Sequence, residues 1–450
     1  MNELKKSKKV PEYLNDAVIY QIFLRAFTPA GTLKSAQKML PHVKSIGADI
    51  VYLCPICEAD SDEDRTYWSI RQRECGFENP KNPYRISDYF HVDSEYGTDD
   101  DLRDFIKTAH SLGLRVILDL VYFHCGPKAV FLEENPDFVQ RDENGDFIIG
   151  GWWLFPRLNY SSQKLREYLW SNMEYYVREF DCDGFRCDVG DLVPLDFWEE
   201  GRARIEKIKP DVMMLNEGKR KEDQIKAFDV NYYFADNEEP GRGSLARLIR
   251  ANKDAAYFKK VYAEYMREFV TDGGLVLLNY DNHDYANDTG KIRYESDPGY
   301  EAVEMILFYM FTMRGVPFLY NGCEVADKSE HNIWANRFHG ANMTIEWENA
   351  LTEKGARRLA KIKEFSNLRK SIPALTCRGC VSFPPCENNN VLTYVREYET
   401  EKYMICLNLS SEKQEARVMD DIKSVVHSCG AEYENGIVKM SCYGYAIFAL

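Results

Sequence analysis

The chain has 450 residues, of which 45% are hydrophobic, enough for sizeable cores and more than one domain. Its formal net charge of −15 argues against a nucleic-acid backbone or an anionic membrane as a partner. No run reaches the roughly 18 consecutive apolar residues of a membrane span, and the charged start lacks the apolar segment of a secretory signal. We therefore expect a cytoplasmic enzyme that acts on a neutral small molecule, and the sequence leaves its oligomeric state open.

Apolar strand-like runs alternate with amphipathic helical patterns over most of the chain. The predicted strands, in chain order, are Val18–Phe23, Ile50–Leu53, Val116–Leu120, Gly184–Asp188, Val212–Asn216, Val230–Phe234, Leu275–Tyr280 and Val316–Tyr320. The helical patterns between them include Leu33–Ile46, Asp99–Leu112, Ser162–Glu179, Leu195–Ile208 and Glu301–Arg314. Eight strands with crossover helices predict an α/β fold, a (β/α)8 TIM barrel, with its active site at the carboxyl ends of the strands.

Two segments fall outside this alternation. Residues 122–159, after the third strand, form a long connection rich in Gly, Pro and aromatic residues, which predicts an inserted subdomain at the active-site face. After the helical stretch Lys354–Lys370, short strand-like runs predict a small all-β domain, a β-sandwich, over residues 372–450. The catalytic barrel would then comprise residues 1–121 and 160–371.

Three acidic residues, Asp188, Glu217 and Asp284, each follow a predicted buried strand. One acidic residue in such a place is usually a helix cap or a loop residue, but three at the ends of the fourth, fifth and seventh strands of a barrel would share one face. Because burying a charge is costly unless it is compensated, we predict a single acidic pocket. Arg186 lies on the same side of its strand as Asp188, so we expect Arg186 to keep Asp188 ionised by lowering its pKa.

The motifs around these acids resemble the α-amylase superfamily, glycoside hydrolase family thirteen. The matching stretches, in chain order, are Val18–Phe23, Tyr84 to Tyr89, Tyr96–Thr98, Gly113–Asp119, Asp119–His124, Gly184–Asp188, Asn282–Asp284 and Gly315–Pro317 with Tyr320–Gly322 and Glu324. Glu217 lies where the family's third signature region has its acid. Each match alone is modest, and their common order over most of the chain makes the resemblance strong.

The resemblance implies a role for each matched residue. Asp188 would be the nucleophile, Glu217 the general acid/base, and Asp284 the third carboxylate that binds sugar hydroxyls and stabilises the transition state. The implied substrate-binding residues are Tyr84, His124, Arg186 and His283, with Asp119 bracing Arg186. A retaining glycosidase needs a nucleophile and an acid about 5 Å apart, with separated pKa values. The implied reaction is hydrolysis of α-glucosidic bonds in α-gluco-oligosaccharides through a covalent glycosyl-enzyme.

Other functions remain open at this point. A glucanotransferase or an α-glucoside isomerase would use the same intermediate and exclude water, and the sequence barely separates these enzymes from a hydrolase. A non-catalytic carbohydrate-binding or interaction scaffold is a more remote alternative. Such relatives typically lose one or more of the three acids, whereas this chain keeps all three. Linkage preference and endo or exo action are likewise not determined by the sequence.

Departures from the family pattern argue against a metal ion. Phe123 stands where calcium-binding members have an Asn ligand, and the loop Arg25–Gly31 lacks the acidic residues of another calcium site. An acidic cluster in the inserted segment, formed by Asp142, Glu143, Asn144 and Asp146, is more typical of a solvated turn. We predict no metal and no cofactor.

The aromatic pair of the inserted segment and the cysteines give weaker signals. Trp152 and Trp153 are secondary candidates for stacking on sugar, because aromatic pairs more often belong to a core. The 13 cysteines fall largely in apolar runs, which favours reduced, buried thiols. Two Cys-x-x-Cys pairs, Cys54/Cys57 and Cys377/Cys380, lack the partner spacing of a specific metal or redox site.

Overall fold

A computed structural model describes residues 6–233, 244–286, 292–339, 343–418 and 422–450. Eight parallel strands close into a barrel in the order β1-β10-β9-β8-β7-β6-β5-β2. They are β1 (Ile19–Ile22), β2 (Ile50–Leu53), β5 (Arg115–Leu120), β6 (Gly184–Cys187), β7 (Met213–Asn216), β8 (Val230–Tyr232), β9 (Leu275–Leu278) and β10 (Val316–Tyr320). All eight predicted strands and the barrel are confirmed. Phe234, the predicted end of the sixth strand, lies outside the described residues.

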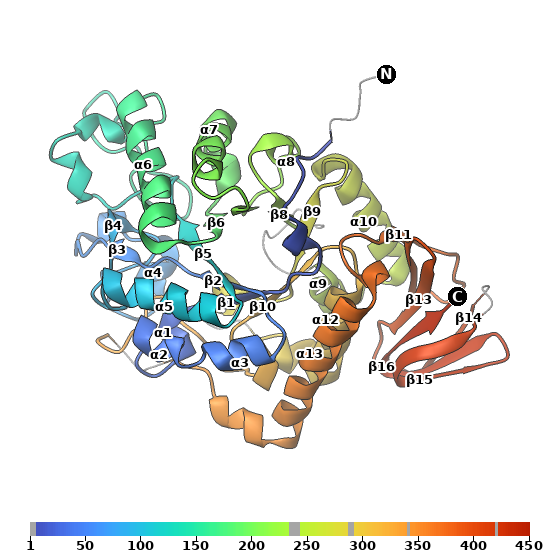
Figure 1. The fold of residues 1–450 in the computed structure, drawn as a ribbon. Coiled ribbons are helices and arrows are strands. Elements are labelled where there is room, and N and C mark those ends of the chain that lie inside the picture. Colours follow the sequence, from blue (N-terminus) through green and yellow to red (C-terminus); the bar gives the residue numbers. More distant parts are fainter. Residues whose placement is uncertain (1–5, 234–243, 287–291, 340–342, 419–421) are drawn as a thin grey trace.

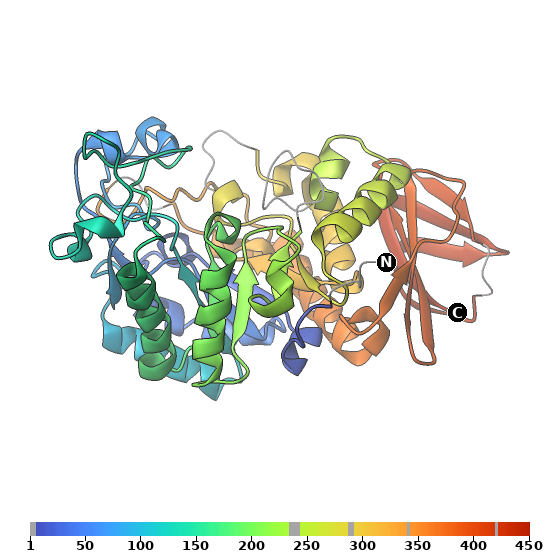
Figure 2. The same ribbon diagram turned by 90° about the horizontal axis from the view of Figure 1, so that it is seen from above.

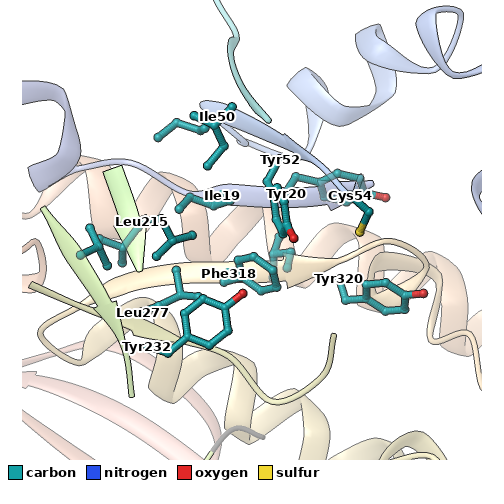
Figure 3. Packing of buried hydrophobic residues seen from close by; sticks show 14 of the residues in the cluster. Ile19, Tyr20, Ile50, Tyr52, Cys54, Leu215, Tyr232, Leu277, Phe318 and Tyr320 are labelled. Carbon is teal, nitrogen blue, oxygen red and sulfur yellow. The ribbon is translucent and has the colours of Figure 1, made fainter. Parts of the chain in front are cut away.

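The barrel strands are nearly continuous apolar runs because both of their faces are buried, as parallel sheets require. Figure 3 shows this core from close by, with Tyr52, Leu215, Leu277 and Phe318 among the labelled side chains. Gln21, on β1, is one of the buried polar residues in these strands. A polar side chain inside such an apolar run indicates a functional site, because burying a polar group without a hydrogen-bond partner costs free energy.

Helices surround the barrel (Figure 1). The longer ones are α5 (Asp99–Ser111), α6 (Gln163–Phe180), α7 (Leu195–Glu206), α10 (Ala255–Phe269), α12 (Tyr300–Thr312) and α13 (Glu353–Ser371). The shorter ones are α1 (Leu24–Phe27), α2 (Leu33–Gln37), α3 (Leu40–Ser45), α4 (Ile70–Glu74), α8 (Asp223–Lys226), α9 (Ser244–Arg250) and α11 (His283–Ala286). Among the described residues, no helix is both long and apolar enough to cross a bilayer.

The predicted helix Leu33–Ile46 is wrong in one respect, because it is two helices. α2 ends at Gln37 and α3 begins at Leu40. Pro41, in the first turn of α3, has no backbone N–H and its ring would clash with the carbonyl of Gln37 in a continuous helix. Pro41 alone therefore explains why the predicted helix is broken, although the apolar residues keep a helical spacing.

A second segment that the sequence analysis did not single out follows β2. It contains β3 (Cys57–Ala59), paired antiparallel with β4 (Ile86–Val92), and the short helix α4. Residues 122–159 lie beside it, since the backbone N–H of Gly126 donates to the Ile86 carbonyl at 2.7 Å. In residues 122–159 the chain forms short 3-10 turns and isolated β-bridges such as His124 to Arg157. Their status as a subdomain stays a prediction.

The C-terminal part is an all-β domain, as predicted, at one end of the molecule (Figure 2). Its antiparallel sheet has the order β11-β12-β13-β16-β14, and β15 also pairs with β16. The strands are β11 (Cys380–Ser382), β12 (Val391–Tyr398), β13 (Glu401–Asn408), β14 (Gln414–Arg417), β15 (Ser424–Glu434) and β16 (Ile437–Ala449). The predicted domain boundaries and the sandwich form stay predictions.

Two buried arginines lie where this sheet meets the barrel. Arg369 of α13 donates to the carbonyls of Phe311 and Met313, at the end of α12, and to others nearby. Arg396 of β12 donates to the carbonyl of Thr312, the last residue of α12. Both side chains are fully buried. The end of one barrel helix is thus satisfied by side chains from α13 and from the sheet.

Candidate active site

The carboxyl ends of β5, β6, β7 and β9 bring the predicted acids to one rim of the barrel. Asp119 of β5 is in register with Arg186 of β6, and Asp188 directly follows β6. Glu217 directly follows β7, and Asp284 lies in α11, shortly after β9. Parallel strands end at the same edge of a barrel, so residues from four separate strands converge there.

The Arg186 guanidinium is the centre of this cluster. Its Nη1 lies 2.8 Å from both carboxylate oxygens of Asp119 and 2.8 Å from Asp188 Oδ1. Its Nη2 lies 2.6 Å from Glu217 Oε2. The Arg186 side chain is only 1% exposed, so one buried cation serves three carboxylates. Charge-assisted contacts of this kind fix the positions of all four side chains.

The backbone after Asp188 adds a second contact to Glu217. Val189 has φ of 38° and ψ of 46°, a left-handed conformation that is unfavourable for a β-branched residue. In this conformation its N–H donates to Glu217 Oε2 at 3.0 Å. Strain of this kind persists only where the surroundings enforce it, and it is common at functional sites.

A chain of hydrogen bonds joins Asp119 to His283 through Tyr84. Tyr84 donates from its hydroxyl to Asp119 Oδ2 at 3.1 Å, and the same hydroxyl lies 2.6 Å from His283 Nε2. Gln21 accepts from the His283 backbone N–H through Oε1, which turns its Nε2 to His283 Nδ1 at 2.7 Å. Since Gln21 Nε2 only donates, Nδ1 accepts and the proton of His283 is on Nε2. Gln21 thus belongs to this hydrogen-bonded cluster; the sequence analysis did not name it, although its polarity within an apolar strand was a usable signal.

The alpha-amylase catalytic-domain family model matches residues 15–151 and 152–373. The chain belongs to the alpha-amylase family. Among curated relatives, a cyclomaltodextrinase from Bacillus sp is 24% identical over 88% of this chain and 73% of its own length. A maltogenic alpha-amylase from Bacillus acidopullulyticus is 24% identical over 90% of this chain and 72% of its own. These relatives and the family model identify the chain as a glycosidase.

Solved structures agree with the fold of this alpha-amylase family member. A noncanonic maltogenic alpha-amylase from Thermotoga neapolitana aligns with a TM-score of 0.78 and 24% identity, covering 97% of this chain and 99% of that one. An alpha-amylase from Lactobacillus plantarum aligns with a TM-score of 0.77 and 21% identity, covering 97% and 99%. Over nearly its whole length, this chain therefore has the same fold as each of these two structures.

The electrostatics of Asp188 differ from the expectation. Burial raises the pKa of the Asp188 carboxyl well above its usual range; Arg186 opposes this rise, and neighbouring Glu217 adds to it. Arg186 does lower the pKa of Asp188, as predicted, but the expected net fall is wrong, because the effect of burial is larger and Arg186 is shared with two other carboxylates. Burial also raises the pKa of Glu217, again against the opposing charge of Arg186.

The pKa of Asp284 is shifted in the opposite direction. Burial raises it, but the contacts with His283 and Arg71 outweigh that effect and hold it well below its usual range. Arg71, in α4, donates from Nη1 to Asp284 Oδ1 at 3.1 Å. No motif in the sequence marked Arg71, which lies in the segment after β2. In this member of the alpha-amylase family the pKa of Asp284 is thus lowered, whereas the pKa values of Asp188 and Glu217 are raised.

His124 and the two tryptophans differ in their surroundings. His124 is buried, its Nε2 lies 2.9 Å from the Tyr84 carbonyl, and its Nδ1 has no hydrogen-bond partner within the described chain. Burial lowers the pKa of His124 to about 4, so its ring is neutral. Trp153 packs with its ring 5.8 Å from that of His124, whereas Trp152 is 70% exposed. Their contacts with sugar stay predictions.

Within the described ranges, no group of three or more His, Cys, Asp and Glu residues has the arrangement to hold a metal ion. Asp142 Oδ1 accepts the backbone N–H groups of Asn144 and Asp146, as in a solvated turn. Phe123 packs with its ring centroid 6.0 Å from that of Trp153. Among the Cys-x-x-Cys pairs, only Cys380 is exposed, and all four thiols are free. The absence of a metal stays a prediction.

Proposed function

We propose that this alpha-amylase family member is a retaining hydrolase of α-linked gluco-oligosaccharides. The proposal rests chiefly on one observation, the grouping of Asp119, Asp188 and Glu217 around the single buried guanidinium of Arg186. The names of the relatives, cyclomaltodextrinase and maltogenic alpha-amylase, support α-glucans as the substrate class.

In the proposed first step, Asp188 attacks the anomeric carbon while Glu217 gives its proton to the glycosidic oxygen. The bond between the anomeric carbon and that oxygen breaks, the aglycone leaves as an alcohol, and the sugar stays bound to Asp188 as an ester. In the second step Glu217 takes a proton from water, whose oxygen attacks the same carbon and releases Asp188. The raised pKa of Glu217 suits the acid of the first step.

The remaining residues would support charge on the sugar. Asp284 stays ionised and can stabilise the oxocarbenium-like transition state and accept hydrogen bonds from sugar hydroxyls. His283 carries its proton on Nε2, next to the Tyr84 hydroxyl, and both groups would line the same sugar subsite. Arg186 would stabilise the ionised form of Asp188 once Glu217 carries the proton.

The proposed location is the cytoplasm, and the proposed partner is a carbohydrate rather than a nucleic acid or a membrane. An intracellular maltogenic amylase from Bacillus subtilis, 24% identical over 85% of this chain and 66% of its own length, supports this. The net charge of −15 is consistent with a neutral substrate.

The first product should keep the α-anomeric configuration, because double displacement inverts the anomeric carbon twice. Proton NMR of a fresh reaction with maltotriose measures this, since the two anomers give separate signals before mutarotation. A β-anomer that appears first would reject the retaining mechanism together with the roles of Asp188 and Glu217. Products longer than the substrate would instead favour the glucanotransferase alternative, and a trisaccharide isomer of maltotriose would favour the isomerase.

Removal of calcium should change neither folding nor activity. A hard cation needs six to eight oxygen ligands, and Phe123 stands where calcium-binding relatives supply one of them. The measurement is dialysis against a strong chelator, followed by a thermal melt and an activity assay. A bound calcium that the fold required would lower the melting temperature on removal and restore it on addition. Such a reversible fall would contradict the prediction.

A further inference from the structure

Asp284, the third carboxylate, is held by a residue from a distant part of the chain. Arg71 donates from Nη1 to Asp284 Oδ1 at 3.1 Å and from Nη2 to the Asp284 carbonyl at 3.2 Å. The two residues are 213 positions apart, with Arg71 in α4 after β2 and Asp284 in α11 after β9. A planar guanidinium that binds both the side chain and the backbone of one residue restricts the rotation of that side chain.

Arg71 is itself fixed in place. Ser69 caps α4 by accepting the Gln72 backbone N–H at 3.1 Å, and the Ile70 N–H donates to the Trp152 carbonyl at 3.1 Å. The Arg71 guanidinium lies 5.4 Å from the centre of the Trp334 ring. A cation over an aromatic face is attracted by the electron density of that face. The guanidinium therefore contacts both Trp334 and Asp284.

Trp334, whose ring Arg71 contacts, is linked to α4 by hydrogen bonds. Gln72, next to Arg71, donates from Nε2 to the Asn79 carbonyl at 2.8 Å. Asn79 in turn donates from Nδ2 to the Trp334 carbonyl at 2.8 Å, and Trp334 is buried. Both the helix that carries the cation and the ring that supports it are thus held by one network. Arg71 is pre-organised before any sugar binds.

The two oxygens of Asp284 face different neighbours. Oδ1 accepts from Arg71, and Oδ2 lies 3.5 Å from Nε2 of His283. Loss of Arg71 would leave the carboxylate with the distant contact to His283 and free its side-chain torsion. Since catalytic groups must be held within about 0.5 Å of their productive positions, such freedom lowers the rate.

We propose that Arg71 is a positioning residue of the active site, which fixes the Asp284 carboxylate for the transition state and does so from the segment after β2. The inference rests on the proposed glycosidase function and extends it. The side chains of Arg71 and Asp284 are each 38% exposed. An ion pair this accessible contributes little to folding stability, so we expect its loss to change the rate rather than the melting temperature.

The test compares Arg71→Met, Arg71→Lys and the control Arg73→Met, with a chromogenic 4-nitrophenyl maltotrioside as substrate. Arg73 lies in the same helix and donates to the Thr66 carbonyl rather than to an active-site residue. We expect Arg71→Met to lower kcat at least tenfold with less change in KM, because the contact serves the transition state. Arg71→Lys should recover part of kcat through its charge, and Arg73→Met should stay within twofold of wild type. Thermal melts of all variants should lie close to that of wild type.

A double-mutant cycle with Asp284→Asn separates positioning from a general structural effect. If Arg71 acts through Asp284, adding Arg71→Met to Asp284→Asn should lower kcat less than twofold further. An independent tenfold loss in that background, or an unchanged kcat for Arg71→Met alone, would overturn the proposal. Should Arg71→Met fail to fold, Arg71→Gln takes its place with the same expectation. An inactive wild-type protein would instead reject the proposed glycosidase function.

Discussion

Asp188→Asn should lower kcat by about a thousandfold or more, because no covalent glycosyl-enzyme can form without the nucleophile. The folded protein should be at least as stable as wild type at neutral pH. Burial raises the pKa of Asp188 above its unfolded value, so its ionised form costs stability at neutral pH, and a neutral Asn avoids that cost. The Asn side-chain oxygen can still accept from Arg186.

Initial rates with malto-oligosaccharides and thermal melts at neutral pH measure both effects. Asp100→Asn is a matched control, since the side chain of Asp100 in α5 is 88% exposed and pairs with Arg103. Its activity and melting temperature should equal those of wild type. A turnover of Asp188→Asn above one tenth of wild type would show that another group is the nucleophile.

Arg186→Met should destabilise the fold by about 3–5 kcal/mol at neutral pH, because it leaves the buried Asp119 and Asp188 and the partly buried Glu217 without their shared cation. Activity should also be lost. The stability effect should depend on pH. The pKa values of Asp188 and Glu217 are raised by burial, so their contribution to stability is fully present below their unfolded pKa values and falls as pH rises through the raised ones.

Without Arg186 the opposing charge is gone, both pKa values rise further, and the loss of stability on ionisation grows. The gap in melting temperature between wild type and Arg186→Met should therefore widen as pH rises through the raised pKa values of the two carboxyl groups. Arg178→Met is the matched control, because Arg178 is 58% exposed and pairs with Glu174 along α6. A gap that does not change with pH would contradict the shared-cation description.

The sequence predicted the barrel well because its strands are buried on both faces and read as continuous apolar runs. The three acids could be predicted from their places after those runs. The segment after β2 could not, because β3 has only three residues and its pairing with β4 is irregular. Arg71 lies in that segment, so its contact with Asp284 depends on tertiary structure that no local pattern encodes.

The direction of the Asp188 pKa shift was wrong for a related reason. The sequence placed Arg186 beside Asp188 on one strand face, and a single pair predicts a lowered pKa. In the structure the same guanidinium also binds Asp119 and Glu217, and the cluster is buried. A strand pattern shows one arginine beside one carboxylate. It does not show how many other carboxylates bind the same arginine, or how far the cluster is buried from water.

The buried arginines at the end of α12 bear on how this chain can be divided. A helix normally ends with carbonyls that water or a local cap can satisfy. Here the carbonyls of Phe311, Thr312 and Met313 are satisfied by Arg369 and Arg396, and Arg396 belongs to β12 of the sheet. Cutting the chain before the sheet would remove Arg396 and with it the guanidinium that donates to the Thr312 carbonyl. We therefore expect that a sheet exchanged between relatives would fit this barrel only if it supplied another donor for the end of α12.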